Sequence, residues 1–168
     1  MIKIGILTIS DKGSKGQRED KSGEALREGV SQIAGKVVRY EIVPDEKDII
    51  AERLAEWADG GEVDVLLTTG GTGLSKRDVT PEATLSVLDR EVPGIAEAMR
   101  AVSLAKTPMA MLSRAVAGQR ASCLIVNMPG SVKAVKECLE AILPAIPHAV
   151  EIIKGEVTEH LAENAGIK

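Results

Sequence analysis

Hydrophobic runs alternate with amphipathic stretches along most of this chain. Short runs rich in Val, Ile and Leu predict buried strands, whereas apolar residues spaced three and four apart predict helices. Strands are expected at residues 2–9, 36–43 and 63–68, and helices at residues 22–33, 46–58, 81–88, 93–104 and 131–153. Residues 115–126 predict a β-hairpin, or two short strands, turning at Gly118-Gln119.

For two of these helices, the sequence also predicts which side is buried or where the helix bends. Ile49, Ile50, Leu54 and Trp57 fall on one side of the helix at 46–58 and are expected to face the core. Prolines at positions 144 and 147 are expected to bend the last helix.

The alternation of strands and helices predicts the fold class. It indicates an α/β fold with a mostly parallel sheet flanked by helices on both faces, a three-layer α/β/α arrangement with a short hairpin near residues 115–126. Residues 1–153 are expected to form a single domain, and residues 154–168 a polar C-terminal tail. In such sheets, ligands bind beyond the carboxyl ends of the strands.

Composition narrows the classes of function. The chain has 168 residues with one Trp, one Tyr and no Phe, so the core is aliphatic and stacking platforms for single-stranded nucleic acid are missing. A formal net charge of −4 also argues against a nucleic-acid partner. No long apolar span or signal peptide is evident, so we expect a cytoplasmic protein without a membrane partner. Two cysteines and two histidines, all distant in sequence, predict neither a disulfide framework nor a zinc site.

A glycine-rich loop is the strongest sign of chemistry. Gly70, Gly71 and Gly73 directly follow a buried strand, and glycines there let backbone N–H groups approach an anion. The string matches neither the Walker A loop nor the dinucleotide fingerprint, and a plain strand-to-helix turn is the alternative. Thr80 is expected to cap the next helix, with Pro81 at its first position.

Three other strand ends carry polar residues that would meet this loop at one edge of the sheet. They are the loop at residues 10–20 with Asp11, Ser14 and Asp20, the segment at 44–46 with Asp45, and the segment at 127–131 that ends in Ser131. Each also has a structural interpretation. Asp11 fits an Asx-turn, and Asp20, Asp45 and Ser131 fit helix caps. Asp78, after the glycine loop, could pair with Arg77 or cap the next helix.

Together these segments resemble the MogA/MoaB family of molybdenum cofactor biosynthesis. The resemblance rests on residues 68–83 (TTGGTGLSKRDVTPEA), on the opening loop from Ser10 to Gly23, and on the strings VPDE at 43–46, Ser113-Arg114 and NMPGS at 127–131. The Gly-Gly-Thr-Gly string is shared with molybdotransferase domains and CinA-type proteins. The complete ordered set over residues 1–153 is specific to the family.

The resemblance implies a molybdopterin adenylyltransferase, in which ATP and molybdopterin give adenylylated molybdopterin and pyrophosphate. The attacking phosphate is mostly ionised near neutral pH, so no histidine or cysteine base is required. The chemistry is then mainly positioning and charge neutralisation. The implied roles are Asp45 and Asp78 as catalytic Mg²⁺ ligands; Asp11, Ser14, Asp20, Gly70, Gly71, Thr72 and Gly73 for ATP; and Ser113, Arg114, Pro129, Gly130 and Ser131 for molybdopterin.

Two alternatives stay open. A CinA-like nucleotide pyrophosphatase would share the glycine loop and hydrolyse a dinucleotide, and a MoaB-like protein would bind molybdopterin without catalysis. The resemblance also implies a homotrimer, or a hexamer, and a molybdenum insertase as a partner. The apolar segment at residues 109–112 would then lie either in the core or at a subunit interface.

Overall fold

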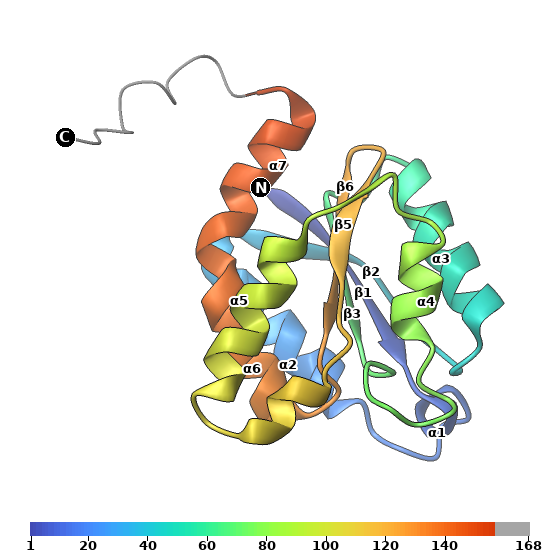
Figure 1. Cartoon of the computed structure of the whole chain (residues 1–168). Helices are drawn as coiled ribbons and strands as arrows, with labels where there is room; N and C mark the ends of the chain where they lie inside the picture. The colour runs from blue at the N-terminus through green and yellow to red at the C-terminus, as the bar shows by residue number, and fades with distance from the viewer. Residues whose placement is uncertain (157–168) are drawn as a thin grey trace.

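A computed structural model of the chain describes residues 1–156 and forms three layers around one twisted sheet (Figure 1). The strands are β1 (Ile2–Ile9), β2 (Gly35–Val43), β3 (Val65–Thr69), β4 (Arg90–Glu91), β5 (Ala117–Arg120) and β6 (Cys123–Met128). The α-helices are α1 (Asp11–Ser14), α2 (Lys21–Val30), α3 (Lys47–Asp59), α4 (Thr80–Leu85), α5 (Pro93–Leu104), α6 (Val132–Ile142) and α7 (Ile146–Lys154). Short 3₁₀ segments lie at η1 (Ser31–Ile33), η2 (Pro108–Leu112) and η3 (Leu143–Ala145).

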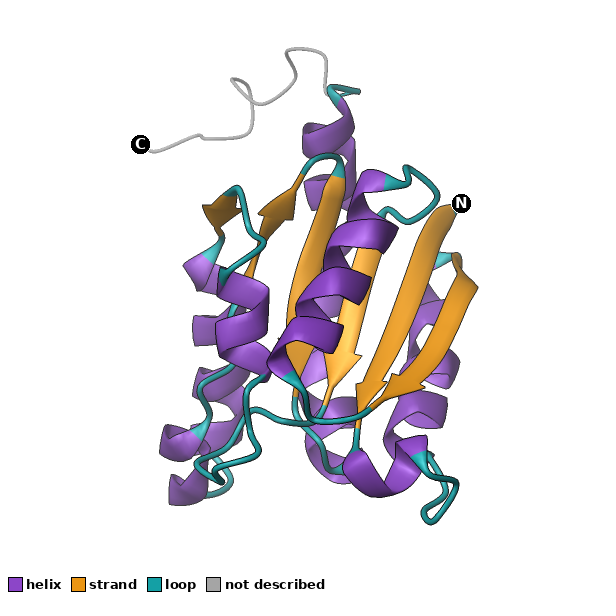
Figure 2. Cartoon of the chain, turned by 90° about the vertical axis from the view of Figure 1, so that its right-hand side faces the viewer, coloured by secondary structure: helices purple, strands orange, loops and turns teal. Residues whose placement is uncertain are grey.

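The sheet has the strand order β2-β1-β3-β6-β5-β4. The neighbours β2, β1, β3 and β6 are parallel, whereas β5 runs antiparallel to β6, and β4 antiparallel to β5. The parallel strands end at the same edge, where the connecting loops gather at the bottom of Figure 2. The fold class predicted from the sequence is confirmed, including the hairpin of β5 and β6.

Each face of the sheet packs on its own hydrophobic cluster. Helices α2, α5, α6 and α7 cover one face, where Ile4, Ile6 and Leu67 are fully buried. Helices α3 and α4 cover the other, against Leu7, Leu66 and Ile125 (Figure 1). The strands are therefore apolar on both sides, which is why they read as continuous hydrophobic runs.

Four predicted details are wrong. The hairpin turns at Ala121, which has a left-handed φ of 47°, because Gly118 pairs with Ile125 inside the ladder. Ile49 is 39% exposed, since it lies outside the arc of α3 that meets the sheet. The N-cap of α4 is Val79, and the Thr80 hydroxyl donates to the Gly70 carbonyl instead. Asp45 does not cap α3, whose N-cap is Glu46.

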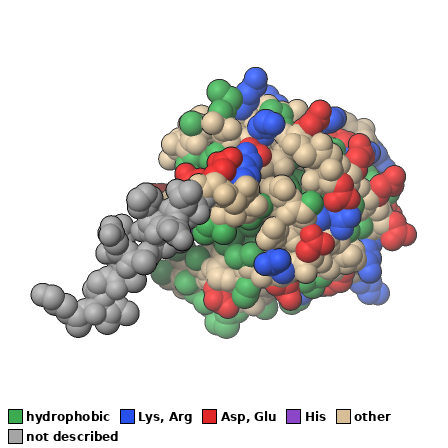
Figure 3. Space-filling view, turned by 90° about the horizontal axis from the view of Figure 1, so that it is seen from above, with side chains coloured by type: hydrophobic (Ala, Val, Ile, Leu, Met, Phe, Trp, Pro, Cys, Tyr) green, Lys and Arg blue, Asp and Glu red, His purple; other side chains and the backbone are tan. Residues whose placement is uncertain are grey.

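The N-terminus and the end of helix α7 lie away from the loop edge (Figure 1). Helix α7 includes Lys154, and the predicted tail beyond residue 156 lies outside the described residues. Seen from the opposite end of the sheet, the surface mixes cationic, anionic and hydrophobic side chains (Figure 3). Within residues 1–156, no helix has the length and apolar character needed to cross a bilayer.

Candidate active site

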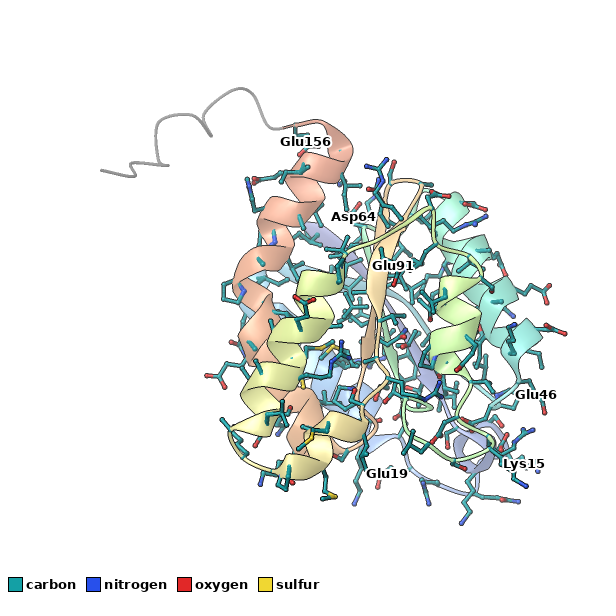
Figure 4. All side chains as sticks on the ribbon, viewed as in Figure 1. Lys15, Glu19, Glu46, Asp64, Glu91 and Glu156 are labelled. Atoms are coloured by element: carbon teal, nitrogen blue, oxygen red, sulfur yellow. The ribbon has the colours of Figure 1, made fainter. Side chains whose placement is uncertain are left out.

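A polar cavity of about 730 Å³ opens at the carboxyl ends of β1 and β3. Its walls come from the loops that follow β1, β2, β3 and β6, which are the four segments singled out in the sequence. Glu19 and Glu46 mark this edge in Figure 4, and Asp64 lies at the other end of the sheet. The lining residues are Thr8, Ile9, Ser10, Gly13, Arg18, Glu19, Asp20, Lys21, Ser22, Asp45, Thr69, Gly70, Gly71, Asp78, Gly130, Ser131 and Val132.

The glycine loop brings backbone close to two carboxylates. Gly70 and Gly71 have φ of 99° and 67°, a region that other residues rarely adopt. A Cβ on Gly71 would lie 3.3 Å from Asp45 Oδ1, and one on Gly73 would lie 2.9 Å from Asp78 Oδ2. Because Gly71 and Gly73 have no side chains, the carboxylates of Asp45 and Asp78 can lie close to the backbone of the loop.

Asp45 is a half-buried carboxylate, and none of the cationic side chains in residues 1–156 forms a salt bridge with it. Burial raises its pKa above the ordinary aspartate value, and the nearby carboxylates of Asp11 and Asp78 act in the same direction. The Asp11 amide donates to Asp45 Oδ2 at 2.9 Å, and the Asp45 amide donates to Asp11 Oδ1 at 3.0 Å. These reciprocal bonds fix the position of Asp45 in the cavity wall.

Arg77 points away from Asp78. Its guanidinium donates to both Asp11 oxygens, at 3.0 and 2.9 Å, and to Glu46 at 2.8 Å. The hydrogen bond from Arg77 lowers the pKa of Asp11. Asp78 instead accepts from the Ser75 amide at 2.9 Å. The alternative in which Asp78 pairs with Arg77 is therefore wrong, and Asp78 is left facing the cavity.

Asp20 is held by four donors of the chain itself. Oδ1 accepts from the Gly23 amide at 2.9 Å and the Ser22 hydroxyl at 3.2 Å, so Asp20 caps α2. Oδ2 accepts from the Thr8 hydroxyl at 2.5 Å and from the Tyr40 hydroxyl. Burial would raise the pKa of Asp20, but these hydrogen bonds outweigh it and lower the pKa. Asp20 thus joins β1, β2 and α2 at the wall of the cavity.

A hydrogen-bond network of buried polar side chains connects the glycine loop to the interior of the protein. Asn127 is fully buried and donates to Thr68 at 3.2 Å and to Thr84 at 2.9 Å. Thr84 donates to the Thr80 carbonyl, and the Thr80 hydroxyl donates to the Gly70 carbonyl at 2.9 Å. This network ties the loop to β6 through residues that no solvent reaches.

A second, more apolar cavity of about 390 Å³ lies beside the first, between α5, η2 and α6. Met99, Ala115 and Cys138 form buried parts of its wall, and Ser113 and Pro129 also line it. Ser131 lines both cavities and caps α6 by accepting from the Ala134 amide at 3.3 Å. The two cavities therefore meet at the start of α6.

The structure divides the predicted site residues into groups. Asp20, Asp45, Gly70, Gly71, Asp78, Gly130 and Ser131 line the polar cavity, and Thr72, Gly73, Ser113, Pro129 and Ser131 line the apolar one. Asp11, Ser14 and Arg114 line neither. Sequence reasoning missed Arg18 and Lys21, two cations in the polar wall, although the basic character of residues 12–21 was a usable signal.

The donor set suits a magnesium ion that arrives with phosphate ligands. Among the described residues, no group of three or more metal-binding side chains is present. Mg²⁺ is commonly held by one or two carboxylates together with substrate phosphates. Asp45 and Asp78 supply such a pair. Burial is the main cause of the raised pKa of Asp45, and the carboxylates of Asp11 and Asp78 add a repulsion that a cation would relieve.

Comparison with known proteins identifies the family. A family model described as "Probable molybdopterin binding domain" matches residues 5–148. A molybdopterin adenylyltransferase of Helicobacter pylori is 47% identical, over 92% of this chain and 89% of its own. The Escherichia coli enzyme of that name is 39% identical, covering 96% and 90%.

A solved structure agrees with this assignment. The molybdopterin biosynthesis enzyme MoaB of Thermus thermophilus superposes with a TM-score of 0.87 and 54% identity, over 92% of this chain and 98% of its own. These matches confirm the resemblance seen in the sequence and extend over nearly the whole length of each protein. The chain belongs to the MogA/MoaB family of probable molybdopterin-binding domains.

Proposed function

We propose that this protein is a molybdopterin adenylyltransferase that transfers AMP from ATP to the terminal phosphate of molybdopterin and releases pyrophosphate. One observation carries the proposal. A polar cavity built from the glycine loop, Asp45 and Asp78 meets an apolar cavity at Ser131. The relatives named as molybdopterin adenylyltransferases supply the reaction.

The proposed reaction needs little covalent help from the protein. A phosphate oxygen of molybdopterin forms a bond to the α-phosphorus of ATP, and the bond to the bridging α,β-oxygen breaks as pyrophosphate leaves. The attacking monoester is mostly ionised near neutral pH, because its second pKa is about 6. The work left to the chain is to hold two anions in line and to offset their repulsion.

The charge of the polar cavity argues for a divalent cation. Its lining contains the carboxylates of Glu19, Asp20, Asp45 and Asp78 against the cations Arg18 and Lys21. A wall with an excess of negative charge repels a triphosphate unless a cation is bound as well. We therefore assign Mg²⁺ to Asp45 and Asp78; when bound, it would neutralise phosphate charge.

The remaining contacts follow from which cavity each residue lines. The amides of Gly70 and Gly71, with Arg18 and Lys21, would bind the ATP phosphates in the polar cavity. Ser113 and Pro129, in the apolar wall, would contact molybdopterin, and Gly130, in the polar wall, would contact it where the two cavities meet. Ser131 is the N-cap of α6, so its hydroxyl and the first amides of that helix suit the phosphate between the two cavities.

We also propose that the protein is a homo-oligomer, with a trimer as the expected state and a molybdenum insertase as the consumer of its product. Met109, Met111 and Leu112 are 64%, 67% and 49% exposed, so they do not belong to the core of this chain. An exposed apolar segment of this kind fits a subunit interface. Light scattering of the purified protein would measure the mass of the assembly directly.

The test is incubation of the purified protein with molybdopterin and ATP, with and without Mg²⁺, while adenylylated molybdopterin is measured. Asp78→Asn should lower the turnover on the order of 100-fold, as losses of single electrostatic contributors do. Asp59→Asn is the control, because Asp59 pairs with Arg120 away from both cavities. An Asp78→Asn variant with full activity would contradict the assigned role.

The same assay separates the alternatives. Tight molybdopterin binding without product would indicate a MoaB-like binding protein. Hydrolysis of ADP-ribose without adenylyl transfer would indicate a CinA-like pyrophosphatase.

A further inference from the structure

Arg114 contacts one residue of each cavity wall, Gly73 and Asp78, but lines neither cavity. It follows η2 in a short connection to β5, and its neighbours Ser113 and Ala115 form part of the apolar wall. The side chain is 33% exposed and turns toward the glycine loop. The role of this large cation must therefore come from the protein groups that it contacts.

The guanidinium of Arg114 donates hydrogen bonds to the loop that carries Asp78. Nε donates to the Gly73 carbonyl at 2.8 Å, and Nη2 donates to the Asp78 carbonyl at 2.8 Å. Nη1 pairs with the Glu82 carboxylate at the start of α4, and the Arg114 amide donates to the Thr72 carbonyl at 3.0 Å. One residue thus holds both ends of the segment 72–78.

Apart from Arg114, the side chain of Arg77 also ties this segment to the rest of the molecule, through its hydrogen bonds to Asp11 and Glu46. The main chain of the segment has few other restraints. The Asp78 amide donates to the Ser75 carbonyl at 3.0 Å, and the Ser75 amide donates to Asp78 Oδ2 at 2.9 Å. These two bonds shape the turn, but both lie inside the segment and do not fix it to the rest of the molecule. Leu74, Ser75, Lys76 and Arg77 are exposed, so packing adds little.

From these contacts we propose that Arg114 is a positioning residue that holds Asp78 in place beside Asp45. It would act from outside the cavities, through the backbone of the loop, and not by touching either substrate. The molybdopterin-binding role predicted for Arg114 from the resemblance is replaced by this one. The enzymatic part of the inference rests on the proposed function, whereas the structural part does not.

The planar guanidinium is suited to this task. It presents donors in a fixed fork, so two carbonyl groups of the loop and the Glu82 carboxylate of α4 can be bound at once. A lysine ammonium at the same position could reach one of them with good geometry. Misplacing a reacting or metal-binding group by about 1 Å can lower a rate on the order of 100-fold.

Arg120 is a matched control within the same chain. Its guanidinium donates to both Asp59 oxygens, at 2.9 and 2.7 Å, and to the Val87 carbonyl at 2.8 Å. Its side chain is 26% exposed, close to the value for Arg114. Arg120 therefore has the same kinds of partner, and it lines neither cavity.

The experiment compares Arg114→Lys with Arg120→Lys in the full chain. Amide hydrogen exchange over residues 72–80 needs no substrate or metal. It should become roughly 10-fold faster in Arg114→Lys and stay unchanged in Arg120→Lys. In the transfer assay, Arg114→Lys should lower kcat roughly 10- to 100-fold. It should also raise the Mg²⁺ concentration for half-maximal rate, with little change in the KM for molybdopterin.

The outcomes separate the two proposals. Unchanged exchange over residues 72–80 in a folded Arg114→Lys variant would overturn the positioning role, and a loss confined to the KM for molybdopterin would point to direct substrate contact. Faster exchange in a protein whose wild type makes no adenylylated product would defeat the proposed function and leave the positioning role standing.

Discussion

Gly71→Ala and Gly61→Ala form a pair that isolates crowding in the glycine loop from backbone strain. Gly71 and Gly61 have nearly the same φ, 67° and 69°, so alanine meets the same left-handed backbone at both. Around Gly61 the added Cβ would find nothing within 4 Å. At Gly71 it would overlap the hydroxyl of buried Thr80 and lie 3.3 Å from Asp45 Oδ1.

The expected magnitudes follow from this difference. Left-handed backbone at a non-glycine residue costs about 1–2 kcal/mol, and Gly61→Ala should lose this much. Gly71→Ala should lose the same amount, plus about 1 kcal/mol for the displaced hydrogen bond of Thr80 and about 1–3 kcal/mol for overpacking. We therefore expect a total of roughly 3–6 kcal/mol, which many domains survive because their stability is about 5–15 kcal/mol.

Urea unfolding measures both values. Trp57 is the only tryptophan and is 5% exposed, so its fluorescence reports loss of the core, and circular dichroism provides a second probe. With a slope of about 2 kcal/mol per molar, the midpoint should fall by about 0.5–1 M in Gly61→Ala and by about 1.5–3 M in Gly71→Ala. Equal shifts in the two variants would refute the crowding argument. Adenylyl transfer should be lost only in Gly71→Ala.

Two further substitutions test groups outside the loop. Tyr40→Phe removes one donor from Asp20 and should lower the free energy of unfolding by about 1–2 kcal/mol, as for a hydrogen bond to a charged group; a urea midpoint equal to that of the wild type would contradict this. Burial acts to raise the pKa of Asp64, but the Lys3 amide and Lys154 outweigh it and lower the pKa. The stabilisation that ionised Asp64 contributes is therefore complete above its unfolded pKa of about 4 and is lost as the pH falls through its folded pKa. Urea midpoints measured between pH 6 and pH 3 should drop less in Asp64→Asn than in the wild type.

Much of the fold follows from local patterns, because each strand is a short apolar run that ends in polar or glycine residues. The strand at residues 2–9 and the helix at 93–104 agree with the structure to the residue. The hairpin turn was misplaced because Gly118 is a strong turn signal, whereas the ladder that contains it depends on pairing with β6. The short β4 and α1 were missed, since neither is long enough to show a period.

The candidate site was predictable as a set of loops but not as a set of contacts. The rule that parallel strands present their carboxyl ends at one edge brought Asp45 and the glycine loop together. It could not show that Arg77 turns to Asp11 and Glu46 while Arg114, far along the chain, binds the loop. Such pairings depend on side-chain direction and long-range packing, which periodicity does not encode.

The junction of the two cavities gives the strongest reason to regard them as one functional unit. A Cβ on Gly130 would lie 3.4 Å from the Gly70 Cα, so the loop after β6 passes close to the glycine loop at backbone level. Ser131 follows directly and is the only residue that lines both cavities among those described. A group transfer requires its two reactants within bonding reach, and separate pockets would not provide this. Reactants held in the two cavities would meet beside Ser131, where the first turn of α6 presents backbone N–H groups to an anion.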